Sequence, residues 1–221
     1  MTQGILPTLP ARSSTTETVY YALREAITNG TLAPASRLRE VHLSRHFGVS
    51  TTPIREALLR LSRDGLVEIS PNRGAIVTAL DRKGIADLYD VREALEERAV
   101  RLAACTSERD FTPLEALLTD ARRCLDEPDQ LTFNRLDIAF HRQLNALGGN
   151  AALAELAEQV HRRIQGVRAR CAIQLAGRPA ISHAHHLALL AAVRDRDADL
   201  AAVTLREHVH SVRDAVLRVL A

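Results

Sequence analysis

The sequence contains no tryptophan, and aromatic residues make up only 3% of its 221 residues. Sandwiches and barrels of β-strands are enriched in aromatic and β-branched side chains, so this scarcity argues against them. Hydrophobic residues still make up 46% of the chain and charged residues 25%, which is ordinary for a globular protein. The composition therefore favours a mainly α fold built from Ala- and Leu-rich helices.

Long apolar runs are also missing. Segments without an ionised side chain, such as residues 143–154, fall short of the ~20 residues that a membrane-spanning helix needs. The opening residues MTQGILPTLPA contain no basic side chain, unlike a secretory signal. We therefore expect a cytoplasmic protein with no membrane partner.

Cysteine is scarce, and its three occurrences, Cys105, Cys124 and Cys171, have no CxxC spacing. An odd number of scattered cysteines indicates neither a disulfide framework nor a thiolate zinc site. We expect all three to be small core residues.

Lysine is nearly absent, since Lys83 is the only one, and arginine carries the basic charge. Residues 1–80 contain nine arginines and six acids, whereas residues 81–221 contain twenty basic and twenty-one acidic residues. Such an asymmetry favours nucleic acid as a partner of the N-terminal part. Biased genome composition also produces arginine-rich chains, so the count alone does not establish DNA binding.

The order of predicted elements in the first eighty residues is that of a winged helix-turn-helix. Residues 1–13 contain two prolines and a glycine and are expected to form a disordered arm. Residues 14–80 form the predicted DNA-binding domain. Its predicted elements are a helix capped by Thr15 or Thr16 that ends near Gly30, helices over 40–47 and 51–64, and strands over 66–70 and 75–79.

From residue 81 onward, apolar side chains recur with the period of a helix. Breaks that contain proline, glycine or a polar pair separate the segments. Six consecutive helices of this kind form an all-α bundle, which we expect over residues 81–221. The predicted helices are 82–106, 111–125, 129–147, 150–176, 180–195 and 198–220.

The helix that follows Ser50 is the predicted recognition helix. Thr51, Thr52 and Arg55 lie opposite its apolar stripe, near the end where recognition helices meet base edges. The planar guanidinium of Arg55 can pair with guanine O6 and N7, which is worth about 1–3 kcal/mol of discrimination. An interaction module with merely solvated arginines is the alternative. Other predicted DNA contacts are Arg39 and Arg45, to phosphates, and Arg73 at the hairpin tip, in or along the minor groove.

The run over residues 44–77, SRHFGVSTTPIREALLRLSRDGLVEISPNRGAIV, resembles the GntR family of bacterial regulators, with its pattern gVSrtPvReAL…L…GLv…rG..V. The resemblance implies binding to double-stranded operator DNA. One recognition helix reads only a half-site, so we expect a homodimer. Two positions depart from the family. Thr51 stands where arginine is usual, so a contact found in relatives is expected to be missing, and Ala35 replaces a frequent turn glycine.

Four residues of the predicted bundle are expected to point inward at the same level along the bundle axis. Asp137 and His141 are four residues apart on one helix. His186 and His208 are 22 residues apart, and the helix break at 196–197 lies midway, so two antiparallel helices bring them level. One carboxylate and three imidazoles suit a divalent ion such as Zn²⁺, Ni²⁺ or Mn²⁺. The alternative is a group of hydrogen-bonded core residues.

The same spacing resembles the metal-binding members of the FadR-type branch of GntR proteins, whose C-terminal all-helical (FCD) domain binds ligands. This likeness covers about residues 83–217. It implies that the four residues are metal ligands and that the C-terminal domain binds an effector.

Arg92 occupies a place in an otherwise apolar helical stripe. A buried guanidinium needs an anionic partner, which is either an internal acid such as Asp137 or a bound carboxylate. In the metal-binding relatives a small organic acid often bridges the metal and such an arginine. The resemblance therefore implies that Arg92 binds the effector.

Together these features indicate a transcription regulator, with repression favoured, whose operator affinity is controlled by a small carboxylate effector at a divalent metal site. One alternative is a metallohydrolase domain fused to a DNA-binding module. No further inward carboxylate stands out as a general base near the four ligands, and a DNA-binding module favours sensing, so we expect no enzyme activity. The other alternative is a regulator whose metal is purely structural.

Overall fold

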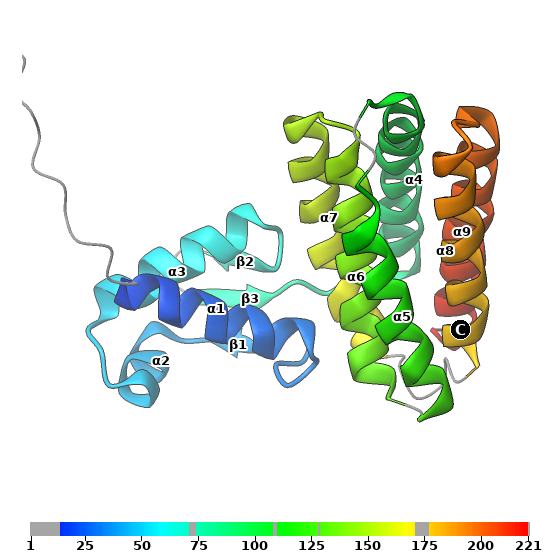
Figure 1. Cartoon of the computed structure of the whole chain (residues 1–221). Coiled ribbons are helices and arrows are strands. Elements are labelled where there is room, and N and C mark those ends of the chain that lie inside the picture. Colours follow the sequence, from blue (N-terminus) through cyan, green and yellow to red (C-terminus); the bar gives the residue numbers. More distant parts are fainter. Residues whose placement is uncertain (1–13, 71–73, 108–109, 128, 171–176, 221) are drawn as a thin grey trace, which may run out of the picture.

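The computed structural model describes residues 14–70, 74–107, 110–127, 129–170 and 177–220. A small N-terminal part stands beside a larger helical bundle (Figure 1). The elements in chain order are α1 (Thr15–Thr28), β1 (Arg37–Leu38), α2 (Glu40–Phe47), α3 (Thr51–Arg63), β2 (Val67–Ser70), β3 (Gly74–Val77), α4 (Arg82–Cys105), α5 (Thr112–Asp126), α6 (Gln130–Leu147), α7 (Ala151–Arg170), α8 (Arg178–Arg194) and α9 (Ala198–Val219). The predicted disordered arm, 1–13, lies outside the described residues.

The N-terminal part is a winged helix-turn-helix, as predicted. α1, α2 and α3 pack beside an antiparallel sheet of order β1-β3-β2, in which Val67 faces Val77 and Arg37 faces Ile76. The core is apolar and centres on α1 and α3, with Leu23, Ile54 and Leu61 buried in it. Strand β1 was not predicted, because two residues are too few to show an alternating pattern.

The start of α1 differs from the prediction by one residue. Ser14, not Thr15 or Thr16, is the N-cap. Its hydroxyl accepts a hydrogen bond from the backbone of Glu17, and the Glu17 carboxylate accepts one from the backbone of Ser14. Only Ser14 has a glutamate three residues later, as this reciprocal capping box requires.

The wing depends on one glycine at the start of β3. Gly74 has a φ of 79°, in the left-handed region, and a Cβ placed there would lie 2.9 Å from the backbone oxygen of Leu38. A side chain at this position would be strained by the backbone angle and would also push β1 away from β3.

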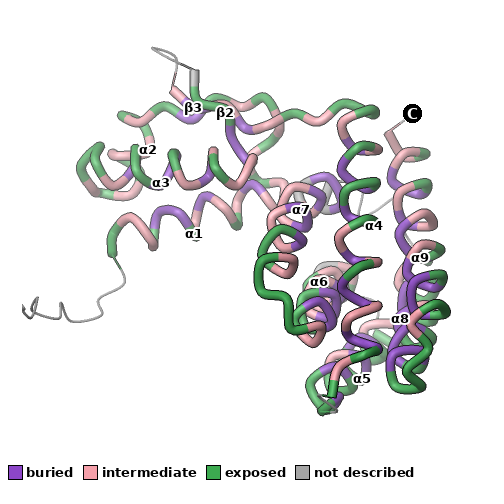
Figure 2. The backbone as a smooth tube through the Cα atoms, turned by 90° about the horizontal axis from the view of Figure 1, so that it is seen from above, coloured by how far each residue is buried: buried purple, intermediate pink, exposed green. Residues whose placement is uncertain are grey.

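The C-terminal part is the predicted all-α bundle of six helices, α4 to α9. Figure 2 shows the buried faces of these helices turned toward one another and the exposed faces turned outward. α4 lies against α9, and α5 lies against α6. The predicted stretch 171–176 at the end of α7 lies outside the described residues. None of the described helices is both long and apolar enough to span a membrane.

Two cysteines do not lie where they were expected. Cys105 is exposed and Cys124 is only partly buried, so their assignment to the core was wrong. Both lie in the last turn of a helix, where the bundle no longer covers them. Cys171 lies outside the described residues.

Candidate functional site

Helix α3 presents the predicted DNA-reading side chains to solvent. Thr51, Thr52 and Arg55 are exposed, while Ile54 and Leu58 on the opposite face are buried. The Ser50 side chain makes no capping bond, although the residue precedes the helix. Helix α3 therefore has one exposed polar face and one buried apolar face, as a recognition helix needs.

Arg55 is held in place by the neighbouring helix. Its Nε lies 3.1 Å from Glu40 Oε1 and its Nη2 lies 2.7 Å from Glu40 Oε2, although 65% of the Arg55 side chain is exposed. This two-point ion pair joins α3 to α2 and fixes the direction of the guanidinium.

The remaining candidate DNA contacts flank this helix pair. Arg39 is the residue before α2, and Arg45 lies in the last turn of α2; both are exposed. Arg73 lies outside the described residues.

The four residues of the candidate metal site meet inside the bundle. α6 supplies Asp137 and His141, α8 supplies His186, and α9 supplies His208, and each is at most 1% exposed. The Nε2 atom of His141 lies 3.1 Å from that of His208 and 3.2 Å from that of His186. One potential ligand atom from each of the four residues falls within 4.8 Å of every other.

This geometry fits a divalent ion. With metal–nitrogen bonds of about 2.0–2.1 Å, two nitrogens at neighbouring corners of a tetrahedron lie about 3.3 Å apart, close to the nitrogen separations of the cluster. Asp137 Oδ1 is buried, has no hydrogen-bond partner among the described residues, and lies 3.5 Å from His186 Nε2. An unpartnered buried carboxylate oxygen facing imidazole nitrogens is the arrangement that an ion would complete.

The protonation of these residues also suits a metal. Burial lowers the pKa of His141, and lowers those of His186 and His208 well below the usual value, so the imidazoles are in the neutral form that binds a metal. Burial alone would raise the pKa of Asp137, but the charge of Arg168 holds it well below the usual value.

Glu96 is a central residue that sequence reasoning missed. It is fully buried on α4, it contacts His161, and its Oε2 lies 3.1 Å from His141 Nδ1. The expectation that no further carboxylate faces the four ligands was therefore wrong. A carboxylate behind the Nδ1 of a metal-binding histidine orients the ring and holds its proton, so that Nε2 faces the ion.

Glu96 is also the internal partner of Arg92. The Arg92 side chain is 1% exposed, as expected, and its Nε lies 3.1 Å from Glu96 Oε1. Asp137, the acid suggested for it from the sequence, instead pairs with Arg168 of α7. The helical stripe gave no sign of this, because Glu96 follows Arg92 by four residues and looks like an exposed i,i+4 ion pair.

The Glu96 carboxylate is kept ionised by its neighbours. Burial alone would raise its pKa, but the charges of Arg92, His141 and His161 lower it well below the usual value. A carboxylate that holds its charge this firmly is a poor general base.

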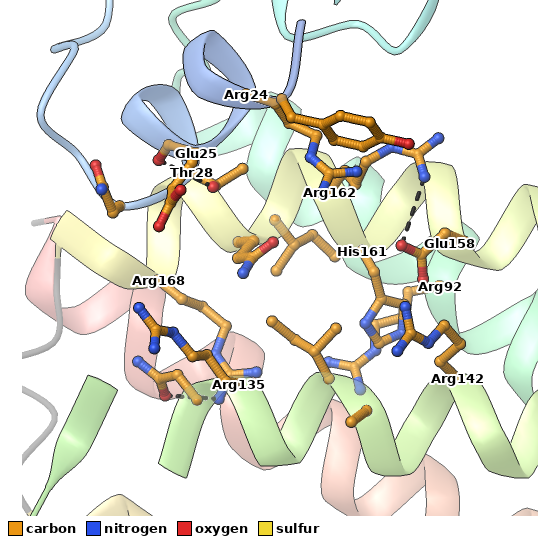
Figure 3. A pocket seen from close by; sticks show the side chains of 17 residues that line it. Arg24, Glu25, Thr28, Arg92, Arg135, Arg142, Glu158, His161, Arg162 and Arg168 are labelled. Atoms are coloured by element: carbon orange, nitrogen blue, oxygen red, sulfur yellow. Dashed lines mark hydrogen bonds and ion pairs between the residues drawn. The ribbon is translucent and has the colours of Figure 1, made fainter. Parts of the chain in front are cut away.

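A cavity of about 450 Å³ lies next to the cluster. Arg92, His161 and Arg168 line it, and each of them contacts a residue of the cluster or Glu96. The opposite wall is formed by α1 of the DNA-binding domain (Figure 3). Six arginines and two glutamates line the cavity, so positive side chains outnumber negative ones in its lining.

Comparison with known proteins agrees with this architecture. The family described as "Bacterial regulatory proteins, gntR family" matches residues 15–77, and the family described as "FCD domain" matches residues 87–211. The chain belongs to the GntR family, with a C-terminal FCD domain. The resemblance inferred from the sequence is thereby confirmed.

Individual relatives of this GntR protein are also regulators. It is 31% identical over 205 residues to an uncharacterized HTH-type transcriptional regulator of Streptomyces ambofaciens, with 91% of this chain and 84% of the relative covered. It is 26% identical over 214 residues to the Escherichia coli transcriptional repressor RspR, with 96% and 92% covered. The solved structure of E. coli McbR/YncC is 25% identical with a TM-score of 0.78, over 93% of this chain and 98% of that chain.

The expectation that the chain is not an enzyme is confirmed, since its family and these relatives are transcriptional regulators. GntR regulators bind operator DNA. The FCD domain and the buried cluster of Asp137 and three histidines together identify a possible metal site.

Proposed function

We propose that this GntR regulator is a repressor that binds operator DNA as a homodimer and responds to a small carboxylate effector at a divalent metal site. The name of the relative RspR supports repression. Arg55 reads a base edge in each half-site, and Arg39, Arg45 and the wing residue Arg73 contact the backbone. Thr51 and Thr52 contribute contacts at the start of α3.

The convergence of three imidazole Nε2 atoms is the observation that carries the metal assignment. Asp137, His141, His186 and His208 hold the ion, which is Zn²⁺, Ni²⁺ or Mn²⁺, the borderline ions that imidazole ligands suit. Such an ion attracts the carboxylate of an acid by its positive charge. A set of hydrogen-bonded core residues would explain the burial but would leave Asp137 Oδ1 without a partner in the part of the chain that the structure describes.

Arg92 supports a carboxylate as the effector. Its Nη2 lies 3.0 Å from His141 Nε2, so the lone pair that His141 would offer an ion is directed at a guanidinium. His141 cannot bind both through one lone pair. When an ion binds His141, Arg92 must turn its Nη2 group away from that nitrogen. The ion and the guanidinium are then two neighbouring positive charges, which favour an anion between them.

The test is operator binding by the full-length protein with and without metal and acid. The operator is first selected from a pool of random duplexes. For zinc-loaded protein, organic acids are screened for one that changes the operator dissociation constant by about 5–150-fold, the usual range of allosteric coupling. Protein stripped by a chelator should lose this response. An equal response without metal would favour the alternative in which the ion is only a structural element.

A further inference from the structure

The cavity beside the metal cluster is shared between the two domains. Tyr21, Arg24 and Thr28 of α1, in the DNA-binding domain, form one wall, and α6 and α7 of the bundle form the others. Figure 3 shows Arg24, Thr28 and Arg162 on one side of the space and Arg135, Arg142 and Arg92 on the other. A volume of about 450 Å³ is within the range of cavities that bind small molecules.

Half of the arginines around this cavity have no carboxylate partner among the described residues. Arg92 pairs with Glu96, Arg168 with Asp137, and Arg162 with Asp64 and Glu158. Arg24, Arg135 and Arg142 make no ion pair within the described ranges, and Arg24 instead lies over the ring of Tyr21, at 4.8 Å from its centroid.

The arginines without a carboxylate partner in the described ranges lie on opposite walls of the cavity, which favours a ligand with more than one negative charge. Each guanidinium binds one carboxylate well, with two parallel hydrogen bonds. Arg24 comes from α1 and Arg142 from α6, on opposite sides of the space. A small acid with two anionic groups would satisfy both.

The α1 wall is connected to the recognition helix. Arg162 Nη2 lies 3.1 Å from Oδ1 of Asp64, and the Tyr20 hydroxyl donates a hydrogen bond of 2.5 Å to Oδ2 of the same carboxylate. Asp64 is the residue at which α3 ends. A ligand held by Arg24 therefore acts at the contact between α7 and the DNA-reading unit of α1 and α3.

We propose that the effector is a small dicarboxylate, that Arg24 of the DNA-binding domain binds one of its carboxylates while arginines of the bundle bind the other, and that the ligand thereby fixes the orientation of the DNA-binding domain. The proposal rests on the carboxylate effector proposed above and adds its second charge and its contact with α1. Arg24 is a ligand-binding and specificity-determining residue of this site.

The experiment compares diacids with monoacids of the same length. Malonate, succinate, glutarate and adipate, each beside the monoacid of equal carbon number, are titrated calorimetrically into zinc-loaded, full-length protein. Wild type should bind the best diacid about tenfold or more tighter than its monoacid, which corresponds to about 1.4 kcal/mol. Arg24→Ala should weaken binding of the best diacid about tenfold and so abolish this preference. Arg63→Ala, which removes an exposed arginine of the same domain outside the cavity, should keep it.

A second measurement uses wild type alone, so its result does not depend on whether Arg24→Ala folds normally. Hydrogen exchange of wild type with the best diacid should slow in both α1 and α7. Equal binding of diacids and monoacids, an unchanged preference in Arg24→Ala, or slowed exchange in the bundle alone would overturn the proposal while leaving the carboxylate effector intact. If wild type bound neither class of acid, the effector and this proposal would both fall.

Discussion

Arg162 of α7 lies 3.1 Å from Asp64, the residue that ends the recognition helix α3. Both side chains are mostly buried, with 16% and 17% exposed. Because the helical bundle and the DNA-binding domain meet at this pair, it is a direct physical connection between the two domains.

A double-mutant cycle measures the strength of that connection. Arg162→Met and Asp64→Asn should show a coupling free energy of unfolding of about 1–2 kcal/mol, because partly buried charge-assisted bonds are stronger than exposed ones. The matched control is the exposed pair Arg122 and Asp126 on α5, each 62% exposed, where about 0.3–0.5 kcal/mol is expected. Equal coupling in the two cycles would show that the junction is an ordinary surface contact.

Arg55→Ala should weaken operator binding by about 1–3 kcal/mol, because the guanidinium loses its base contact while the core of α3 is untouched. Fluorescence anisotropy with the selected operator gives the dissociation constant. Arg63→Ala, at the other end of the same helix, is the control and should have a smaller effect. Retention of wild-type affinity in Arg55→Ala would remove its role in recognition.

Ala35→Gly should stabilise the protein by about 0.5–1 kcal/mol in chemical unfolding. Ala35 has a φ of 62°, a left-handed conformation that costs an alanine about 1–2 kcal/mol, against the smaller entropic cost of a glycine. Ala33, two residues earlier, has no positive φ, so Ala33→Gly should be neutral or destabilising. Stabilisation of both variants to the same extent would refute the backbone explanation.

The sequence predicted the elements better than the contacts between them. Helical periodicity located the six bundle helices. The 22-residue spacing of His186 and His208 correctly predicted that these two residues lie side by side, with ring centroids 4.8 Å apart. Glu96 could not be recognised, because an acid four residues after Arg92 has the spacing of an exposed i,i+4 ion pair on a helix. Only the packing of α6 and α7 against α4 shows that this pair is buried.

Arg168 was missed for a related reason. It lies near the end of α7, in a helix with many arginines, and no local pattern distinguishes it from Arg162 or Arg163. Its pairing with Asp137 depends on how α7 crosses α6, which periodicity does not determine. The cavity between α1 and the bundle likewise depends on the placement of two domains and has no signature in the sequence.

Arg92→Lys should retain zinc and lose affinity for the acid effector. Lysine keeps the positive charge beside Glu96 but not the planar group that binds a carboxylate at two points. Arg92→Ala is a poorer probe, because leaving Glu96 buried without this partner should cost about 3–5 kcal/mol of stability. Calorimetric titration of zinc and then of the acid separates the two affinities. Loss of zinc binding in Arg92→Lys would contradict the separation of roles.

The most direct test of the metal site is a calorimetric titration of Zn²⁺ into chelator-stripped, full-length protein. Wild type should bind one ion per chain, and His208→Ala should lose that binding because one of three converging imidazoles is gone. His210→Ala is the matched control, since His210 lies on the same helix, is 45% exposed and pairs with Glu93. It should bind zinc like wild type. Equal zinc binding in His208→Ala and wild type, or no uptake by wild type, would contradict the assignment of Asp137, His141, His186 and His208 as a metal site.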